Sequence, residues 1–133
     1  MSKKNEWREG YKVVLASWSG ELISAIMDKR DGGCVTYRPG EIATPCLGCG
    51  PLCVFTSYEA AANFCGESEQ IWRCQYKPSD KTEAWIKFRS WIRPINFMPD
   101  GTALADAVIL TEKVRDDEIK KQWMKYEPRL QFA

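Results

Sequence analysis

The stretch Leu52-Cys53-Val54-Phe55-Thr56-Ser57-Tyr58-Glu59 carries the clearest local pattern in the chain. Its first four residues are apolar and predict a short buried strand. Thr56 and Glu59 have the spacing of a capping box, so the helix is predicted to begin with Thr56 as its N-cap. Alanines at 60–62 suit that helix, and Gly66 is the residue type that ends one. A strand followed at once by a capped helix is therefore expected at the centre of the fold.

Shorter extended segments lie on both sides of this unit. Residues 11–16, 21–27 and 34–37 are predicted as strands, separated by the turns Ser17-Trp18-Ser19-Gly20 and Asp31-Gly32-Gly33. Residues 71–76 alternate, which places Trp72, Cys74 and Tyr76 on the core face, and residues 104–114 end the sheet. Residues 83–95 fit a strand, which we favour, but they also fit a helical stripe through Trp85, Phe88 and Ile92, so both alternatives stay open.

The length and the order of these segments predict one domain over residues 1–133. We expect an α+β fold: a mostly antiparallel sheet, the capped central helix, and a C-terminal helix over residues 116–126 packed on the sheet. That last helix is predicted by Asp116-Asp117-Glu118 at its start and lysines further on, the order that a helix dipole favours. Residues 1–10 are charged and are expected to form a flexible N-terminus.

The composition argues against several classes of function. Nineteen basic and 18 acidic residues give a net charge of +1, too little to attract nucleic acid or an anionic membrane as a whole. The chain has no histidine, which excludes serine–histidine and cysteine–histidine nucleophiles and imidazole metal sites. No apolar run approaches the roughly 18 residues of a membrane span, and no secretory signal begins the chain. We therefore expect a cytoplasmic protein whose six cysteines are reduced.

The segment Cys46-Leu47-Gly48-Cys49-Gly50-Pro51-Leu52-Cys53 is the most suggestive chemically. Cys46 and Cys49 have the Cys-X-X-Cys-Gly spacing of a zinc knuckle, and Cys53 could reach the same ion. A closed site needs a fourth ligand from Cys34, Cys65 or Cys74, and the chain has no second Cys-X-X-Cys. The sequence therefore favours a glycine-rich loop with incidental cysteines. No cofactor is predicted, and zinc stays as an alternative.

A second candidate lies in residues 85–93, where tryptophans alternate with lysine and arginine. Such a pattern is typical of surfaces that stack nucleic-acid bases, but the balanced charge favours a strand with one buried face and cations outside. Trp85 and Trp91 are taken as candidate binding residues, together with Tyr37 and Arg38.

Several runs of the chain together resemble a family of small uncharacterised phage and prokaryotic proteins, for which no activity can be carried over. The matching runs are Tyr11-Lys12-Val13-Val14, Val35-Thr36-Tyr37-Arg38-Pro39-Gly40-Glu41, Pro51-Leu52-Cys53-Val54-Phe55-Thr56-Ser57-Tyr58-Glu59-Ala60-Ala61, Cys74-Gln75-Tyr76-Lys77-Pro78-Ser79 and Gly101-Thr102-Ala103-Leu104-Ala105-Asp106-Ala107-Val108.

The strand, capped helix and strand also look like the middle of the ADP-ribosyltransferase fold. That likeness implies a nicotinamide pocket lined by Thr36 and Tyr37, with Tyr11 near the start of the first strand. The chain departs from the family's pattern, because Lys12 stands where arginine or histidine is expected and only Glu112 is a formal candidate for the catalytic glutamate.

The leading functional hypothesis is a small phage or prokaryotic accessory or interaction domain without catalysis of its own. Its partner would be a protein rather than nucleic acid or membrane. The alternatives are a degenerate ADP-ribosyltransferase-like nucleotide-binding protein or enzyme, and a zinc-stabilised binding module.

Overall fold

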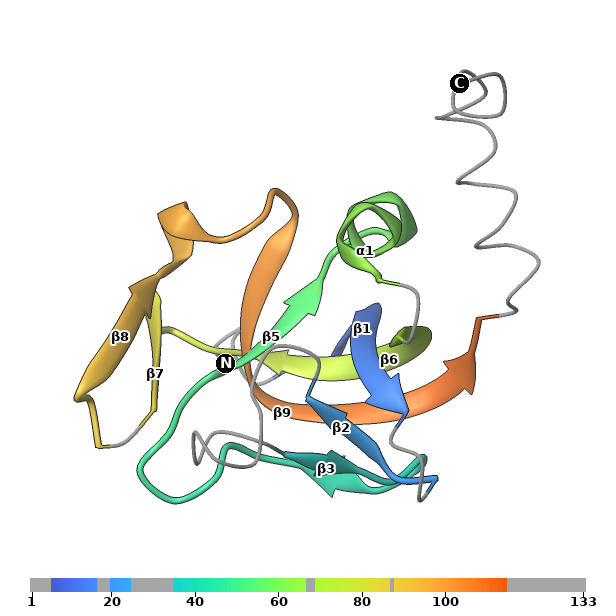
Figure 1. Cartoon of the computed structure of the whole chain (residues 1–133), viewed down its shortest axis with the longest axis horizontal. Coiled ribbons are helices and arrows are strands. Elements are labelled where there is room, and N and C mark those ends of the chain that lie inside the picture. Colours follow the sequence, from blue (N-terminus) through green and yellow to red (C-terminus); the bar gives the residue numbers. More distant parts are fainter. Residues whose placement is uncertain (1–5, 17–19, 25–34, 67–68, 87, 115–133) are drawn as a thin grey trace.

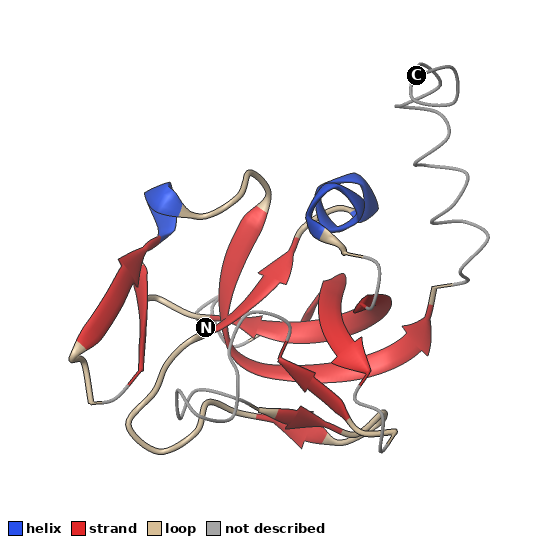
Figure 2. Cartoon of the chain, in the orientation of Figure 1, coloured by secondary structure: helices blue, strands red, loops and turns tan. Residues whose placement is uncertain are grey.

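A computed structural model of the chain describes residues 6–16, 20–24, 35–66, 69–86 and 88–114. Strands predominate in this part of the chain, and one α-helix is present (Figures 1 and 2). In chain order the elements are β1 (Arg8–Ala16), β2 (Leu22–Ser24), β3 (Thr36–Tyr37), β4 (Ile42–Ala43), β5 (Leu52–Phe55), α1 (Tyr58–Phe64), β6 (Glu69–Pro78), β7 (Glu83–Ile86), β8 (Trp91–Pro94), the 3-10 helix η3 (Ile95–Phe97) and β9 (Thr102–Lys113).

Four of the strands close into a small barrel. β1 pairs antiparallel with both β5 and β6, and β9 pairs antiparallel with the same two strands, so the order β1–β5–β9–β6 returns to β1. β9 is long enough to pair with β5 through residues 102–105 and with β6 through residues 105–113. β6 shifts register after Arg73 and after Lys77, and such bulges bend a strand around a barrel. β2 and β3 extend the sheet beside β1, and β4 extends it beside β9.

The predicted α+β class is therefore wrong, because the described part of the chain is mostly β and is organised around this barrel. Local patterns predict strands over residues 11–16, 21–27, 34–37, 52–55, 71–76 and 104–114 but not β4, and they do not show that β1 and β9 each pair with two other strands. Closure of the barrel depends on those long-range pairings. The predicted C-terminal helix over residues 116–126 lies outside the described residues. β5 and β6 run in the same direction, since both are antiparallel to β1 and β9, and α1 connects them.

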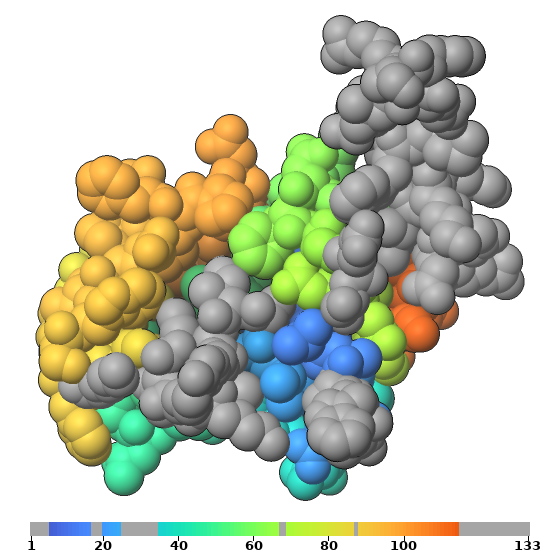
Figure 3. Space-filling view, viewed as in Figure 1, coloured from blue at the N-terminus to red at the C-terminus, as the bar shows by residue number. Residues whose placement is uncertain are grey.

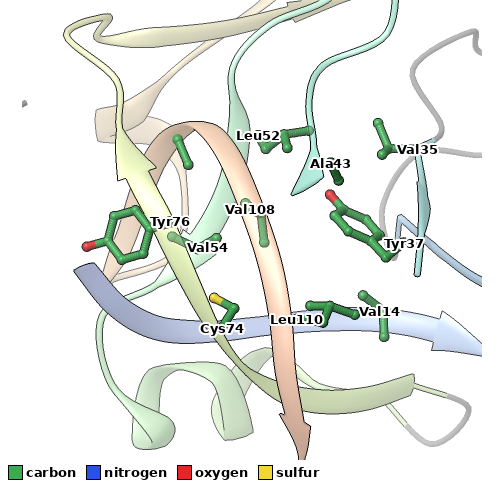
Figure 4. Packing of buried hydrophobic residues seen from close by; sticks show 11 residues of the cluster. Val14, Val35, Tyr37, Ala43, Leu52, Val54, Cys74, Tyr76, Val108 and Leu110 are labelled. Atoms are coloured by element: carbon green, nitrogen blue, oxygen red, sulfur yellow. The ribbon is translucent and has the colours of Figure 1, made fainter. Parts of the chain in front are cut away.

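The core lies on both faces of β1. On one face, the interior of the barrel is filled by side chains shown in Figure 4, among them Val14, Val54, Cys74, Tyr76 and Leu110. On the other face, α1 covers a second cluster that includes Val13, Phe55, Ala61 and Ile71. The burial of Cys74 and Tyr76 confirms the predicted core face of the strand over residues 71–76.

The helix begins one residue later than its capping pattern predicts. Ser57 is the N-cap, and its side-chain oxygen accepts a hydrogen bond of 3.1 Å from the Ala60 backbone N–H. Thr56 instead binds the turn before β9, because its backbone N–H and its hydroxyl both donate to the Gly101 carbonyl oxygen, at 2.9 and 3.3 Å. The C-cap is Cys65 rather than Gly66.

Residues 83–95, which the sequence leaves open between strand and helix, are mainly extended but do not form one strand. β7 and β8 make an antiparallel hairpin that stands beside the barrel, at the left of Figure 1. The chain reverses at Phe88 and Arg89, whose φ angles are 54° and 70°. Neither residue is of a turn-forming type, so the sequence gives no signal for this reversal. In the described part of the chain, no helix has the length and apolar character to span a membrane.

Candidate functional site

A cavity of about 590 Å³ is lined by residues of the barrel and of the β7–β8 hairpin. The barrel contributes Lys12 of β1 and Leu52, Cys53 and Phe55 of β5, while the hairpin contributes Trp85, Ile86, Trp91 and Arg93. In the space-filling view the hairpin forms the left flank of the molecule (Figure 3). Because the two sides come from separate sheets, the cavity depends on how the hairpin is attached to the barrel.

The segment over residues 46–53, called the cysteine loop below, attaches the hairpin to the barrel. Gly50 and Trp85 exchange backbone hydrogen bonds, with the Gly50 N–H donating to the Trp85 carbonyl at 3.0 Å and the Trp85 N–H donating to the Gly50 carbonyl at 2.5 Å. The Phe88 N–H donates to the Gly48 carbonyl at 2.8 Å. The loop therefore runs along β7 as a further extended segment before Pro51 leads into β5.

A tight turn within this loop sets the positions of the first two cysteines. The Cys49 N–H donates to the Cys46 carbonyl at 2.9 Å, and Gly48 has a φ of +80°, which suits the third position of a type II turn. Cys46, Cys49 and Cys53 all line the cavity. Within the described residues, however, no group of three or more cysteine and carboxylate side chains is arranged to hold a metal ion.

The deeper thiols are held in their neutral form by burial. Burial raises the pKa of Cys53, although the positive charges of Lys12 and Arg93 oppose this. The Cys53 sulfur lies 4.0 Å from the Met98 sulfur. In the barrel core, burial raises the pKa of Cys74 to about 12. A protonated thiol is a weak nucleophile, so these two cysteines contribute apolar surface rather than reactivity.

Lys12 is the most unusual residue of the cavity, since its side chain is only 7% exposed. Its Nζ donates a hydrogen bond of 2.5 Å to the Cys53 carbonyl and lies 5.2 Å from the centroid of the Tyr37 ring. Burial disfavours the ammonium and would lower the pKa of Lys12, but the charges of ionised Tyr37 and Cys53 and a hydrogen bond with Tyr37 outweigh it, so the pKa of Lys12 is raised. The surroundings of Lys12 thus favour its ammonium form over the neutral amine.

The cations of the hairpin lie against its own tryptophans. The Arg93 guanidinium is 5.2 Å from the Trp91 ring centroid, and the Arg89 guanidinium is 4.6 Å from the Trp85 ring centroid. Arg89 also pairs with Glu83 at 2.6 Å. The alternation of aromatic and basic residues in the sequence thus corresponds to cation–π contacts within the hairpin.

Most of the candidate residues named from the sequence meet in this one cavity. Tyr37, Trp85 and Trp91 line it, as do the three loop cysteines, whereas Arg38 is exposed and is not among the lining residues. Lys12 is the residue that sequence reasoning did not select as a binding residue. The sequence did contain one signal for it: Lys12 stands within a strand, directly between the apolar residues Tyr11 and Val13.

The residues implied by the ADP-ribosyltransferase likeness are divided between different parts of the fold. Tyr37 lines the cavity, but Tyr11 packs edge-on against Tyr58 of α1, with ring centroids 5.8 Å apart. Glu112 pairs with Arg73 on the surface at 2.6 Å. Neither Tyr11 nor Glu112 is among the described residues that line the cavity.

Comparison of the chain with protein-family models, with curated proteins and with solved structures finds no match.

Proposed function

We propose that this chain is a small-molecule-binding domain and that its ligand occupies the cavity between the barrel and the hairpin. The observation that carries the proposal is the cavity itself, whose 590 Å³ lies within the roughly 300–1,000 Å³ of known ligand pockets. Its walls are largely apolar and include the rings of Phe55, Trp85 and Trp91, with few polar groups. Such a lining, with a small number of oriented polar groups, is what pockets for drug-sized molecules have in common.

The size of the cavity favours an organic ligand over solvent. Its volume corresponds to about 20 water molecules at the density of the liquid. Water gains few hydrogen bonds from walls of tryptophan, phenylalanine and aliphatic side chains, whereas an apolar ligand gains from leaving bulk water. The domain is thus still proposed to act by binding, but its partner is a small molecule rather than the protein expected from the sequence.

The test is a titration of the full chain with Nile red, a neutral dye that fluoresces in apolar surroundings. Trp91→Ala should weaken binding about five- to thirtyfold, since the ring supplies part of the roughly 1.5–3 kcal/mol that a buried aromatic side chain contributes. Trp91 is 39% exposed, so the protein should tolerate its removal.

The matched control is Trp7→Ala, because Trp7 stacks with Lys77 and is not among the lining residues. This variant should bind Nile red like the wild type. If the wild type does not bind the dye, or if both variants lose affinity equally, the cavity is not the binding site.

A second proposal follows from the likeness to ADP-ribosyltransferases and is supported by the position of Tyr37 in the cavity. In that case the chain binds NAD there, in spite of the separate positions of Tyr11 and Glu112. Calorimetric titration with NAD, competition of NAD with Nile red, and transfer of labelled ADP-ribose test it. No heat and no competition would remove this second proposal and leave the first intact.

A further inference from the structure

We infer that the ligand is an apolar molecule with a single acid group, carboxylate or phosphate, and that this group lies against the Lys12 ammonium. The inference rests on the proposed function, since it specifies what the cavity binds. Three features of the described residues lead to it: the sign of the charges that line the cavity, the environment of Lys12, and the burial of the Tyr37 hydroxyl.

The charged side chains among the described residues that line the cavity are all basic. Lys12 and Arg93 contribute positive charge, and no aspartate or glutamate is among the described residues that line it. The whole chain is almost balanced, with 19 basic and 18 acidic residues, so this local excess is not a consequence of composition. The positive charges of Lys12 and Arg93 both lower the pKa of Cys53, although burial raises it more. Their combined field favours a negatively charged group there.

Among the described residues, Lys12 has no carboxylate partner of the kind that a buried ammonium usually has. None of the ion pairs between described residues includes it, and a buried charge without a counter-charge is costly. An ammonium has three donors, and the Cys53 carbonyl accepts from it at 2.5 Å. The ring of Tyr37 covers a further side of the ammonium at 5.2 Å. Neither the carbonyl nor the ring carries a full negative charge, and no described carboxylate pairs with the ammonium, so an anionic ligand group would complete this site.

The Tyr37 hydroxyl is a second incomplete polar group at the same place. The residue is 2% exposed, and its hydroxyl has no partner at full hydrogen-bond distance among the described residues, although it interacts with the Lys12 ammonium closely enough to raise the pKa of Lys12. Buried hydroxyl groups almost always have a partner. An acid oxygen bound at Lys12 would bring an acceptor close to this hydroxyl as well. The rest of such a ligand would extend along the apolar lining toward Trp85 and Trp91.

The acid group can be tested without any mutation by comparing ligands of one chain length. Dodecanoate, dodecyl phosphate and dodecanol are used to displace Nile red from the full wild-type chain. A charge-assisted hydrogen bond that the alcohol cannot form predicts that an acid displaces the dye about ten- to a hundredfold more tightly than dodecanol. Preference for dodecanoate or for dodecyl phosphate supports the inference in either case and identifies the acid.

The variant Lys12→Met keeps the length and apolar stem of the side chain and removes its charge. Displacement is measured relative to this variant's own affinity for Nile red, and the preference for acid over alcohol should fall to less than about threefold. Lys81→Met is the control, because Lys81 is exposed and does not line the cavity, and it should keep the full preference. Far-ultraviolet circular dichroism and a melting curve establish that each variant is folded.

The possible failures are distinguishable. If dodecanol and both acids displace the dye equally from the wild type, the inferred acid group is wrong and the binding cavity stands. If the preference for an acid persists in folded Lys12→Met, the acid does not lie against Lys12, and the assignment is overturned. If the wild type binds neither Nile red nor dodecanol, the proposed function itself fails.

Discussion

Replacement of Gly101 by alanine tests the junction between α1 and β9, which also borders the cavity through Thr102. Gly101 has a φ of +85°, and a Cβ at this position would lie 2.6 Å from the Ala60 Cβ of α1. Its carbonyl accepts the Thr56 N–H at 2.9 Å, so the backbone cannot move away without loss of that hydrogen bond. We therefore expect Gly101→Ala to destabilise the protein for two separate reasons.

The two contributions can be given magnitudes. A left-handed conformation costs a non-glycine residue about 1–2 kcal/mol. An additional carbon in a packed position costs about 1–3 kcal/mol, and here the neighbour is a short helical side chain that cannot rotate away. The free energy of unfolding should thus fall by about 2–5 kcal/mol, which for a domain of this size lowers Tm by about 8–20 °C.

Thermal and urea unfolding, followed by circular dichroism, measure this loss, and two variants separate its parts. Gly40→Ala has the same backbone strain, because its φ is +83°, but nothing lies within 4 Å of the added Cβ. It should lose only about 1–2 kcal/mol. In Gly101→Ala/Ala60→Gly the close contact is removed, so about 1–3 kcal/mol should return, less the roughly 1 kcal/mol that glycine costs in a helix.

A loss of stability in Gly101→Ala no larger than in Gly40→Ala would show that the contact with Ala60 contributes nothing. Additive effects of the changes at Gly101 and Ala60 would show the same. Residues in direct contact should show a coupling free energy of at least about 0.5 kcal/mol in a double-mutant cycle.

Three further changes probe other parts of the fold. Ser57→Ala removes the N-cap and should lower the free energy of unfolding by about 1 kcal/mol in urea, whereas a larger loss from Thr56→Ala would contradict the assignment of the cap. Burial raises the pKa of Cys74 from 9.0 to about 12, so the folded protein holds more protons than the unfolded chain and stability should fall by up to about 4 kcal/mol as the pH rises through this window. Cys74→Ala should flatten that alkaline slope in pH-dependent melting, and an unchanged slope would show that another group titrates. Glu112→Gln breaks the exposed pair with Arg73 and should cost less than about 1 kcal/mol at low salt and nothing measurable at high salt.

The strands of this protein are largely visible in its sequence, but their partners are not. The alternation over residues 71–76 correctly places Cys74 and Tyr76 in the core. β6 nevertheless pairs with β1, more than 50 residues earlier, and with β9 on its other side. A periodic pattern reports which face of a strand is buried, and it carries no information about which strand lies beside it. The closure of the barrel could therefore not be predicted.

The candidate site was predictable in part, for a similar reason. The alternation of Trp85 and Trp91 with cations points to them as binding residues, and both line the cavity, with Arg89 and Arg93 lying over their rings. A lysine within a strand is ordinarily expected to face solvent. Lys12 is buried because its Nζ reaches the carbonyl of Cys53, which is 41 residues away in the sequence.

The cysteine loop shows how one spacing can suit two different roles. A zinc knuckle needs a tight turn between its cysteines and glycines beside the sulfurs, and the turn from Cys46 to Cys49 has this geometry. In this protein, packing against the hairpin is sufficient to explain why glycine occupies positions 48 and 50. A Cβ on Gly48 would lie 3.0 Å from the Phe88 ring, and one on Gly50 would lie 3.2 Å from the Trp85 ring.

The absence of a side chain at Gly48 and Gly50, together with the backbone hydrogen bonds of the loop to Trp85 and Phe88, sets the distance between the loop and the hairpin. The hairpin forms one wall of the cavity, and Pro51 continues from the loop into β5, which forms the other. Small residues in the loop therefore set how closely the two walls approach, because any side chain at Gly48 or Gly50 would push Phe88 or Trp85 outward. The lack of side chains at Gly48 and Gly50 therefore determines the width of the cavity, and this steric effect does not depend on an ion at the sulfurs.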